Sequence, residues 1–127
     1  MAKILVIEDD ATFFGLLRVH LSGAGHQVRI AEDAVIGLRS VIAEPPDLVI
    51  LDMYVPYLDG FELLEALRLD AATRDIPVIV LTGRSDDETY ARAQRIGVAD
   101  YFTKPIQSEQ LLASIEKHVR ARGAETS

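Results

Sequence analysis

Short apolar runs alternate with longer amphipathic segments along most of the chain. Five apolar runs, each bounded by polar or turn residues, predict β-strands at residues 3–7, 27–31, 48–51, 78–81 and 99–102. The second run is more polar than the others, which is typical of a strand at the edge of a sheet. Between these runs, apolar residues recur three or four positions apart, and this spacing predicts helices.

The predicted helices have recognisable ends. The first carries Phe14, Leu17 and Leu21 on one face and ends near Gly23, since glycine commonly terminates a helix. Asp33 is a candidate N-cap of the second helix. The remaining helices are expected at residues 34–43, from 59–60 onward, at about 86–96 and at 108–122.

Strands that alternate with helices indicate βαβ units, and these build a parallel sheet with helices on both faces. Right-handed crossovers leave few arrangements of such units. We therefore expect an α/β fold with a five-stranded parallel sheet in the flavodoxin-like order 2-1-3-4-5. Residues 1–122 are predicted to form one domain, and residues 123–127 a tail or linker.

Polar residues stand where the predicted strands end. The acidic run at 8–10 follows the first strand, Asp52 the third, Thr82 the fourth and Lys104 the fifth. Because the carboxyl ends of parallel strands meet at one edge of the sheet, we expect these side chains to share a crevice. Each also has an ordinary structural explanation, since acids and threonine cap helices and lysines are commonly solvated.

Several carboxylates in one partly desolvated crevice repel one another unless a positive group offsets them. Mg²⁺ suits a site with few carboxylates, several waters and a phosphate. An aspartate can also act as a nucleophile toward phosphorus. Mg²⁺ and the Lys104 ammonium can neutralise a transferred phosphoryl group, to which the Thr82 hydroxyl can donate a hydrogen bond. The pattern therefore favours phosphoryl transfer to Asp52.

Composition narrows the classes of function. The chain has 127 residues, 49% of them hydrophobic, as in one ordinary globular domain. It has no cysteine, which excludes disulfides and thiolate metal sites. A net charge of −7 argues against direct contact with nucleic acid. Without a membrane-length apolar run or a signal peptide, we expect a cytoplasmic protein with no membrane contact. The histidines lack partner spacing and are expected at the surface: His20, His26 and His118.

Four segments together carry a family resemblance: ILVIEDD, DLVILDMYVPYLDG, PVIVLTG and DYFTKP. With them, the chain resembles over nearly its full length the receiver domain of two-component response regulators, of the chemotaxis-regulator-like kind. The resemblance implies that Asp52 is the phosphoacceptor. It implies that Asp9 binds Mg²⁺ directly and that Glu8 binds it through water. The Tyr54 backbone carbonyl would complete the protein ligands, and Lys104 would bind the phosphoryl group.

The resemblance also implies a switch and its partners. Thr82 would be the switch hydroxyl and Tyr101 the aromatic residue that turns with it, which would remodel the face of the fourth helix, fifth strand and fifth helix. The fourth helix has the thinnest apolar face, as expected of a switch element: mainly Tyr90, Ala93 and Ile96. The partners would be a histidine kinase or histidine phosphotransfer protein upstream and an effector protein or domain downstream.

Two positions beside the phosphoacceptor bear on the lifetime of the phosphorylated state. Tyr54 lies two residues after Asp52, and Arg84 lies two after Thr82. By the same resemblance, these places influence how easily water attacks the acyl phosphate. A phenol and a guanidinium there would shield the phosphoryl group, and our hypothesis is slow autodephosphorylation.

Three other interpretations of these residues are less well supported. A haloacid-dehalogenase-type phosphatase requires a second acid two residues after its nucleophile, where this chain has Tyr54. A flavodoxin-like cofactor binder would need a phosphate-cradling loop after the first strand, and the acids at 8–10 would repel phosphate there. A degenerate receiver that only docks would not need the complete set of acids, Thr82 and Lys104.

Overall fold

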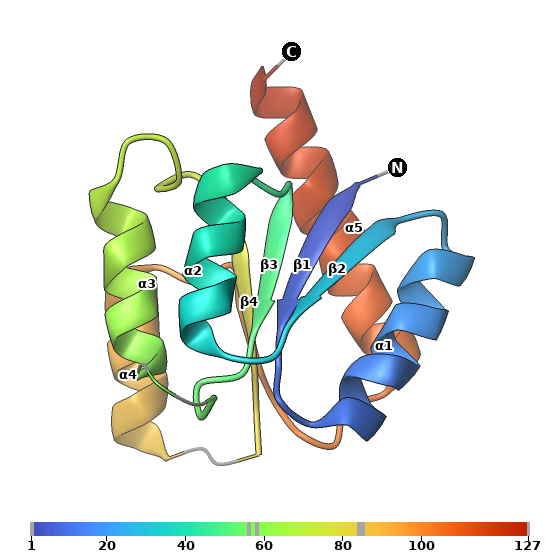
Figure 1. The fold of residues 1–127 in the computed structure, drawn as a ribbon, viewed down its shortest axis with the longest axis horizontal. Helices are drawn as coiled ribbons and strands as arrows, with labels where there is room; N and C mark the ends of the chain where they lie inside the picture. The colour runs from blue at the N-terminus through green and yellow to red at the C-terminus, as the bar shows by residue number, and fades with distance from the viewer. Residues whose placement is uncertain (1, 56, 58, 84–85, 127) are drawn as a thin grey trace.

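The computed structural model describes residues 2–55, 57, 59–83 and 86–126, and side chains as far as residue 120. Strands and helices alternate throughout, as predicted (Figure 1). In chain order they are β1 (Lys3–Ile7), α1 (Ala11–Gly23), β2 (Gln27–Ala31), α2 (Ala34–Ala43), β3 (Leu48–Leu51), α3 (Gly60–Leu69), β4 (Val78–Thr82), α4 (Asp87–Ile96), β5 (Asp100–Thr103) and α5 (Ser108–Thr126).

The five strands form one parallel sheet in the order β2-β1-β3-β4-β5, which confirms the predicted topology and the place of β2 at an edge. All the strands finish at the same edge of the sheet, the lower one in Figure 1. Ile7 at the end of β1 is the register partner of Leu51 at the end of β3. The residues that follow these two strands therefore emerge side by side.

The helices cover both faces and create two separate cores (Figure 1). On one face, α2 and α3 pack against the sheet through Val41, Leu63, Leu64 and Leu67. On the other, α1 and α5 pack through Leu17, Leu21, Leu111 and Ile115. The three central strands, β1, β3 and β4, are almost completely buried between these layers, which explains their continuous apolar runs.

The last helix is longer than the sequence pattern indicated. We predicted that it ends at Arg122, but α5 continues to Thr126, so residues 123–126 are helical. That these residues form a tail or linker outside the domain remains a prediction. No helix in the described part of the chain combines the length and the apolar character needed to cross a membrane.

The prediction of three surface histidines is right for His20 but wrong for His26. The His26 side chain is 5% exposed. Its Nδ1 accepts a hydrogen bond from the Ala2 backbone N–H at 3.2 Å, and its Nε2 lies 2.6 Å from Glu116 Oε1. His118 is also mostly covered, with its side chain 18% exposed. Both pack between elements distant in sequence, so local spacing gave no signal of their burial.

Candidate functional site

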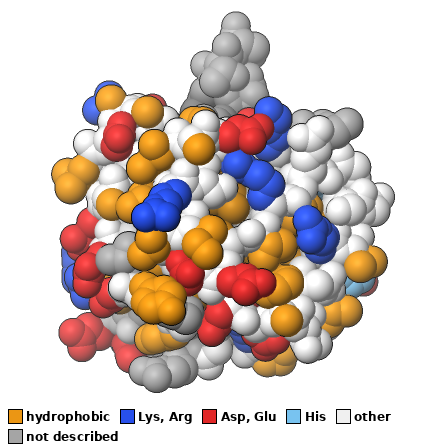
Figure 2. Space-filling view, viewed as in Figure 1, with side chains coloured by type: hydrophobic (Ala, Val, Ile, Leu, Met, Phe, Trp, Pro, Cys, Tyr) orange, Lys and Arg blue, Asp and Glu red, His pale blue; other side chains and the backbone are white. Residues whose placement is uncertain are grey.

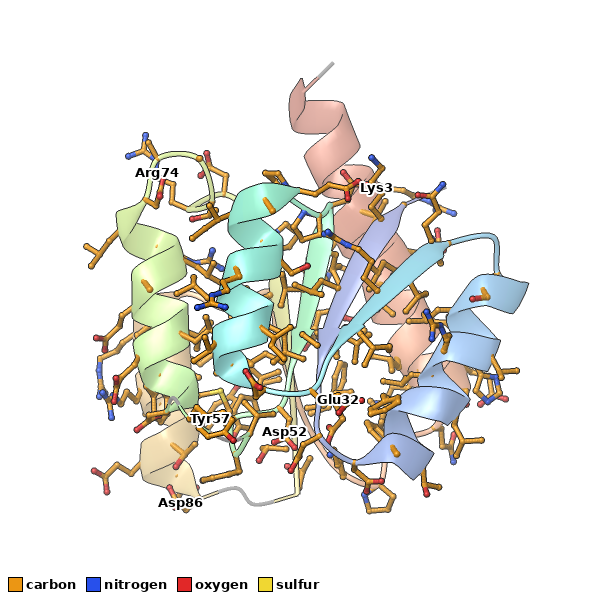
Figure 3. The ribbon with its side chains drawn as sticks, viewed as in Figure 1. Lys3, Glu32, Asp52, Tyr57, Arg74 and Asp86 are labelled. Carbon is orange, nitrogen blue, oxygen red and sulfur yellow. The ribbon has the colours of Figure 1, made fainter. Side chains whose placement is uncertain are left out.

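The candidate site lies at the edge where the strands end, and its acids follow β1 and β3. Glu8 is 2% exposed and Asp52 is 8% exposed, whereas Asp9 is exposed. Carboxylate oxygens of these three residues all lie within 4.8 Å of one another. Figure 3 shows Asp52 at this edge, and Figure 2 shows acidic side chains gathered along the lower part of the same view. The predicted convergence of the acidic residues is therefore present.

Asp10 has a different place from its two acidic neighbours. Its Oδ1 accepts hydrogen bonds from the backbone N–H groups of Thr12 and Phe13, at 3.0 and 3.2 Å, and so caps α1. The Asp10 backbone N–H donates to Glu8 Oε1 at 3.1 Å. The ordinary explanation, a helix cap, thus applies to one acid of the run, and this capped turn also orients Glu8.

Lys104 comes from the end of β5 and reaches into the crevice. Its Nζ lies 2.7 Å from Glu8 Oε2 and 3.3 Å from Asp52 Oδ2, and its side chain is 20% exposed. The Lys104 backbone N–H donates to the Thr82 carbonyl at 2.8 Å, which fixes the start of the side chain beside β4. Lys104 is therefore part of the acidic site and is not simply solvated.

The charges of this site perturb one another. Burial raises the pKa of Glu8, and the negative charge of Asp52 raises it further. The hydrogen bond from Lys104 lowers this pKa, but the net pKa is still raised. Burial alone would lower the pKa of Lys104. Its hydrogen bond to Glu8 and the charge of Asp52 outweigh burial, however, so the net pKa is raised. The crevice therefore holds a firmly protonated ammonium between two buried carboxyl groups.

A contact that the sequence analysis missed completes the surroundings of Lys104. The ring of Phe13, in the first turn of α1, lies with its centroid 4.3 Å from Lys104 Nζ. An ammonium at this distance from an aromatic face is attracted by the ring quadrupole. In the sequence Phe13 is one more apolar residue of an amphipathic helix, and no local pattern distinguishes it.

The segment after Asp52 is held against the site by α3. The Tyr54 backbone N–H donates to Asp52 Oδ1 at 3.0 Å, and the Tyr54 side chain is 44% exposed. A Cβ on Gly60 would lie 2.7 Å from Met53 Cα, so only glycine allows α3 to begin this close. Tyr57, five residues after Asp52, has a φ of 78° and is 82% exposed, and it appears near Asp52 in the view of Figure 3. Such backbone strain in a bulky residue is uncommon and clusters at functional sites.

The predicted switch residues lie on β4 and β5. Thr82 is fully buried at the end of β4. Tyr101 is half-buried, and its ring meets that of Tyr90 edge to face, with centroids 5.2 Å apart and planes at 86°. Arg84, to which we assigned an influence on dephosphorylation, lies outside the described residues.

The donor set fits a hard divalent cation. Glu8, Asp9 and Asp52 each offer a carboxylate oxygen to one small volume. Mg²⁺ is bound in proteins through one or two carboxylates together with water and substrate phosphate. The exposure of Asp9 leaves one side of the cluster open to water. The chain therefore has the oxygen ligands that such an ion requires.

Fold and site together define a class: a flavodoxin-like α/β domain whose carboxyl edge carries an acidic cluster and a lysine. The family model of the response regulator receiver domain matches residues 4–116, and the chain belongs to this family of two-component signalling domains. Receiver domains generally bind Mg²⁺ at an acidic pocket and work with histidine kinases and effector domains. Family membership therefore favours the receiver interpretation over the phosphatase and the cofactor binder.

Relatives of known name agree with this assignment. Protein PilH of Pseudomonas aeruginosa is 38% identical over 115 residues, which cover 91% of this chain and 95% of that protein. The DNA-binding dual master transcriptional regulator RpaA of Synechocystis is 36% identical over 120 residues, 94% of this chain but 50% of that protein. A CheY-like receiver domain from Methanospirillum hungatei superposes with a TM-score of 0.92 at 26% identity, covering 98% of both chains.

These relatives qualify one expectation. The chain spans about half the length of RpaA, and RpaA is a DNA-binding regulator by name. The phosphate regulon transcriptional regulatory protein PhoB of Pseudomonas aeruginosa is 32% identical, and this chain covers 52% of it. The expectation that this chain has no direct contact with nucleic acid therefore finds no support among its relatives.

Proposed function

We propose that this receiver domain accepts a phosphoryl group on Asp52 from a histidine kinase or a histidine phosphotransfer protein, and passes the signal to an effector. One observation above all supports this. The Asp52 carboxylate is buried at the edge of the sheet with the Lys104 ammonium 3.3 Å from its Oδ2. Such an aspartate has a charge partner that can also neutralise an incoming phosphoryl group.

The reaction is a phosphoryl transfer between two proteins. A carboxylate oxygen of Asp52 attacks the phosphorus of a phosphohistidine, the P–N bond breaks, and its electron pair returns to the imidazole, which then takes up a proton. The product is an acyl phosphate on Asp52. The Tyr54 backbone N–H holds Asp52 Oδ1, which limits rotation of the carboxylate before transfer.

Mg²⁺ would be held by Glu8, Asp9 and Asp52, with the Tyr54 backbone carbonyl as a further ligand, and would offset negative charge during transfer. The close grouping of the three carboxylates supports this assignment. The remaining positive charge comes from Lys104, and the Thr82 hydroxyl would donate a hydrogen bond to the bound phosphoryl group. Thr82 and Lys104 are already joined through the backbone, since the Lys104 N–H donates to the Thr82 carbonyl at 2.8 Å.

The switch would then run from Thr82 to Tyr101 and α4. Movement of the Thr82 hydroxyl toward the phosphoryl group would vacate space into which Tyr101 turns, and this would break its contact with Tyr90 and remodel the α4–β5–α5 face. The weak packing of α4 supports this, because Ala93 is its single fully buried residue within the described chain.

The lifetime of the acyl phosphate would depend on Tyr54 and Arg84, which would shield it from water. The half-exposed ring of Tyr54, two residues from the phosphoacceptor, supports a shielding role. In a variant that combines Tyr54→Ala with Arg84→Ala, we expect faster loss of the phosphoryl group. An unchanged decay rate would remove this part of the proposal.

The test is intact mass after incubation with acetyl phosphate, with and without Mg²⁺. We expect one added phosphoryl group that requires both Mg²⁺ and Asp52, and that is lost in Asp52→Ala. Glu32→Gln is a matched control, because Glu32 is an exposed acid at the same edge of the sheet (Figure 3). Phosphorylation that persists in Asp52→Ala would refute the site. If no mass is added, a purified histidine kinase supplies the second donor, and failure with both donors would refute the function.

A further inference from the structure

The Lys104 ammonium is enclosed by three groups that come from different elements. Glu8 follows β1, Asp52 follows β3, and the Phe13 ring belongs to α1. Two of these groups are carboxylates within 3.3 Å of Nζ, and the third is an aromatic face 4.3 Å away. The ring is the one group of the three with no part in binding a metal or a phosphoryl group.

The two carboxylates do not hold the ammonium symmetrically. Nζ lies 2.7 Å from Glu8 Oε2 but 3.3 Å from Asp52 Oδ2, so the stronger hydrogen bond draws it toward Glu8. A lysine side chain is long and flexible, and water would compete for its three donors. An aromatic face attracts the cation without accepting a directed hydrogen bond, so it restricts Nζ to the crevice and leaves its donors free for oxygen atoms.

We infer that Phe13 is a positioning residue that keeps the Lys104 ammonium facing Asp52, ready for the phosphoryl group. The expected effect of Phe13 on phosphorylation rests on the proposed function. The positioning of the Lys104 ammonium rests only on its contact with the Phe13 ring. Without the ring, the Lys104 ammonium would move away from Asp52, either further toward Glu8 or toward solvent, and the charge that offsets the incoming phosphoryl group would be misplaced. The requirement is for a ring, not merely for an apolar side chain.

A purely structural role for Phe13 must be separated from this one. Phe13 also packs at the border of the core between the sheet, α1 and α5, where Phe14 lies as well. It lines a small cavity of about 100 Å³ between α1 and α5, so leucine at position 13 leaves no sealed void. Among the described residues, the cation–π contacts involve the rings of Phe13 and Phe61 and not that of Phe14. Phe14→Leu is therefore the matched control for loss of an aromatic ring from the same helix.

The first measurement is the NMR signal of the Lys104 side chain, which does not depend on phosphorylation. The chain has three lysines, and Lys104→Arg identifies the signal of interest. We expect the Lys104 side-chain protons to be shifted upfield by the ring. The shift should disappear in Phe13→Leu and persist in Phe13→Tyr and Phe14→Leu. A Lys104 signal that is unchanged in Phe13→Leu would overturn the inference, whether or not the protein is phosphorylated.

The second measurement is the rate of phosphorylation by acetyl phosphate and Mg²⁺. We expect Phe13→Leu to reduce the rate by about threefold to tenfold, the range for a cation–π contact of this kind, and Phe13→Tyr to restore it. In a Lys104→Ala background, Phe13→Leu should have no further effect. If Phe13→Leu lowered the rate as much in the Lys104→Ala background as in wild type, its effect would be independent of Lys104. That result would overturn the positioning role. If wild type gains no phosphoryl group from any donor, the proposed function fails and the NMR shift alone decides the inference.

Discussion

Helices α3 and α4 are neighbours on the same face of the sheet and have the same length, ten residues, but they are held in opposite ways (Figure 1). α3 buries four residues: Gly60, Leu63, Leu64 and Leu67. α4 buries Ala93 alone among its described residues. Arg92 of α4 also borders a cavity of about 510 Å³, whose other walls include Met53, Val55 and Phe61. One helix is part of the core, whereas the other rests on it.

Polar and aromatic contacts replace hydrophobic burial in α4. The Arg92 guanidinium lies 4.2 Å over the centroid of the Phe61 ring, and Tyr90 meets Tyr101 edge to face. The Gly97 carbonyl, just after the helix, accepts hydrogen bonds from Arg68 Nε at 3.1 Å and from its terminal nitrogen at 2.9 Å. Such contacts can exchange partners at small cost, unlike the interlocked side chains of a core.

The difference separates two tasks. α3 begins against Met53 and so fixes the segment that carries Asp52, which must stay in place for transfer. α4 begins after Thr82 and contacts Tyr101, the residues proposed to move. Elements that move are usually the less stable parts of a protein. The firmly packed α3 therefore suits the site of phosphoryl transfer, and the weakly packed α4 suits the proposed switch.

The largest effect is expected from the core of α3. Leu64→Ala should reduce the free energy of unfolding by about 2–5 kcal/mol, because it removes a fully buried side chain and leaves a cavity. Leu69→Ala, the same change in the same helix at a residue 87% exposed, should stay within about 0.5 kcal/mol of wild type. Urea denaturation measures both. Equal losses in the two variants would contradict the view that α3 is held by burial.

The second largest effect is expected from the arginine that fixes the end of α4. Arg68 also donates from Nη1 to the carbonyls of Arg74 and Ile76, at 3.0 and 2.9 Å. Arg68→Ala should cost about 1.5–3 kcal/mol, since it removes hydrogen bonds from a charged donor and leaves carbonyls unpaired. Hydrogen exchange should then accelerate at residues 93–97 more than within α3. Arg74→Ala, which keeps its backbone carbonyl, is the control, and a comparable loss there would refute this role of Arg68.

Arg68 also marks the limit of what the sequence could predict. The fold followed from local signals, because buried strands appear as apolar runs and Asp33 is the N-cap of α2, as predicted. Asp59 and Asp86 cap α3 and α4 in the same way. The acidic site followed from topology, which brings the ends of distant strands together. Side chains that join elements far apart gave no such signal. The His26–Glu116 pair, 90 residues apart, and the Phe13–Lys104 contact both look in the sequence like ordinary surface or core positions.

A smaller effect is expected at the contact between α4 and β5. A double-mutant cycle of Tyr90→Leu and Tyr101→Leu should give a coupling free energy of about 0.5–1.5 kcal/mol, as edge-to-face aromatic pairs do. Tyr90→Phe keeps the ring and should keep the coupling. If the proposed switch turns Tyr101, the coupling should fall once Asp52 is phosphorylated. A coupling that is the same in both states would argue that this contact does not belong to the switch.

The smallest effect is expected from the charge pair that bridges the two helices. Arg92 lies 3.5 Å from Glu65 of α3, and the two side chains are 45% and 50% exposed. Glu65→Gln should therefore change the free energy of unfolding by no more than about 0.5 kcal/mol, because water and salt screen exposed pairs. Arg92→Ala should cost more, since it also removes the contact with Phe61. Urea denaturation at low and high salt separates the two contributions. If the contact between Arg92 and the Phe61 ring holds α4 to α3, the loss of stability in Arg92→Ala should persist at high salt. If the charge pair did so instead, Glu65→Gln would cost as much as Arg92→Ala at low salt, and both losses would vanish at high salt.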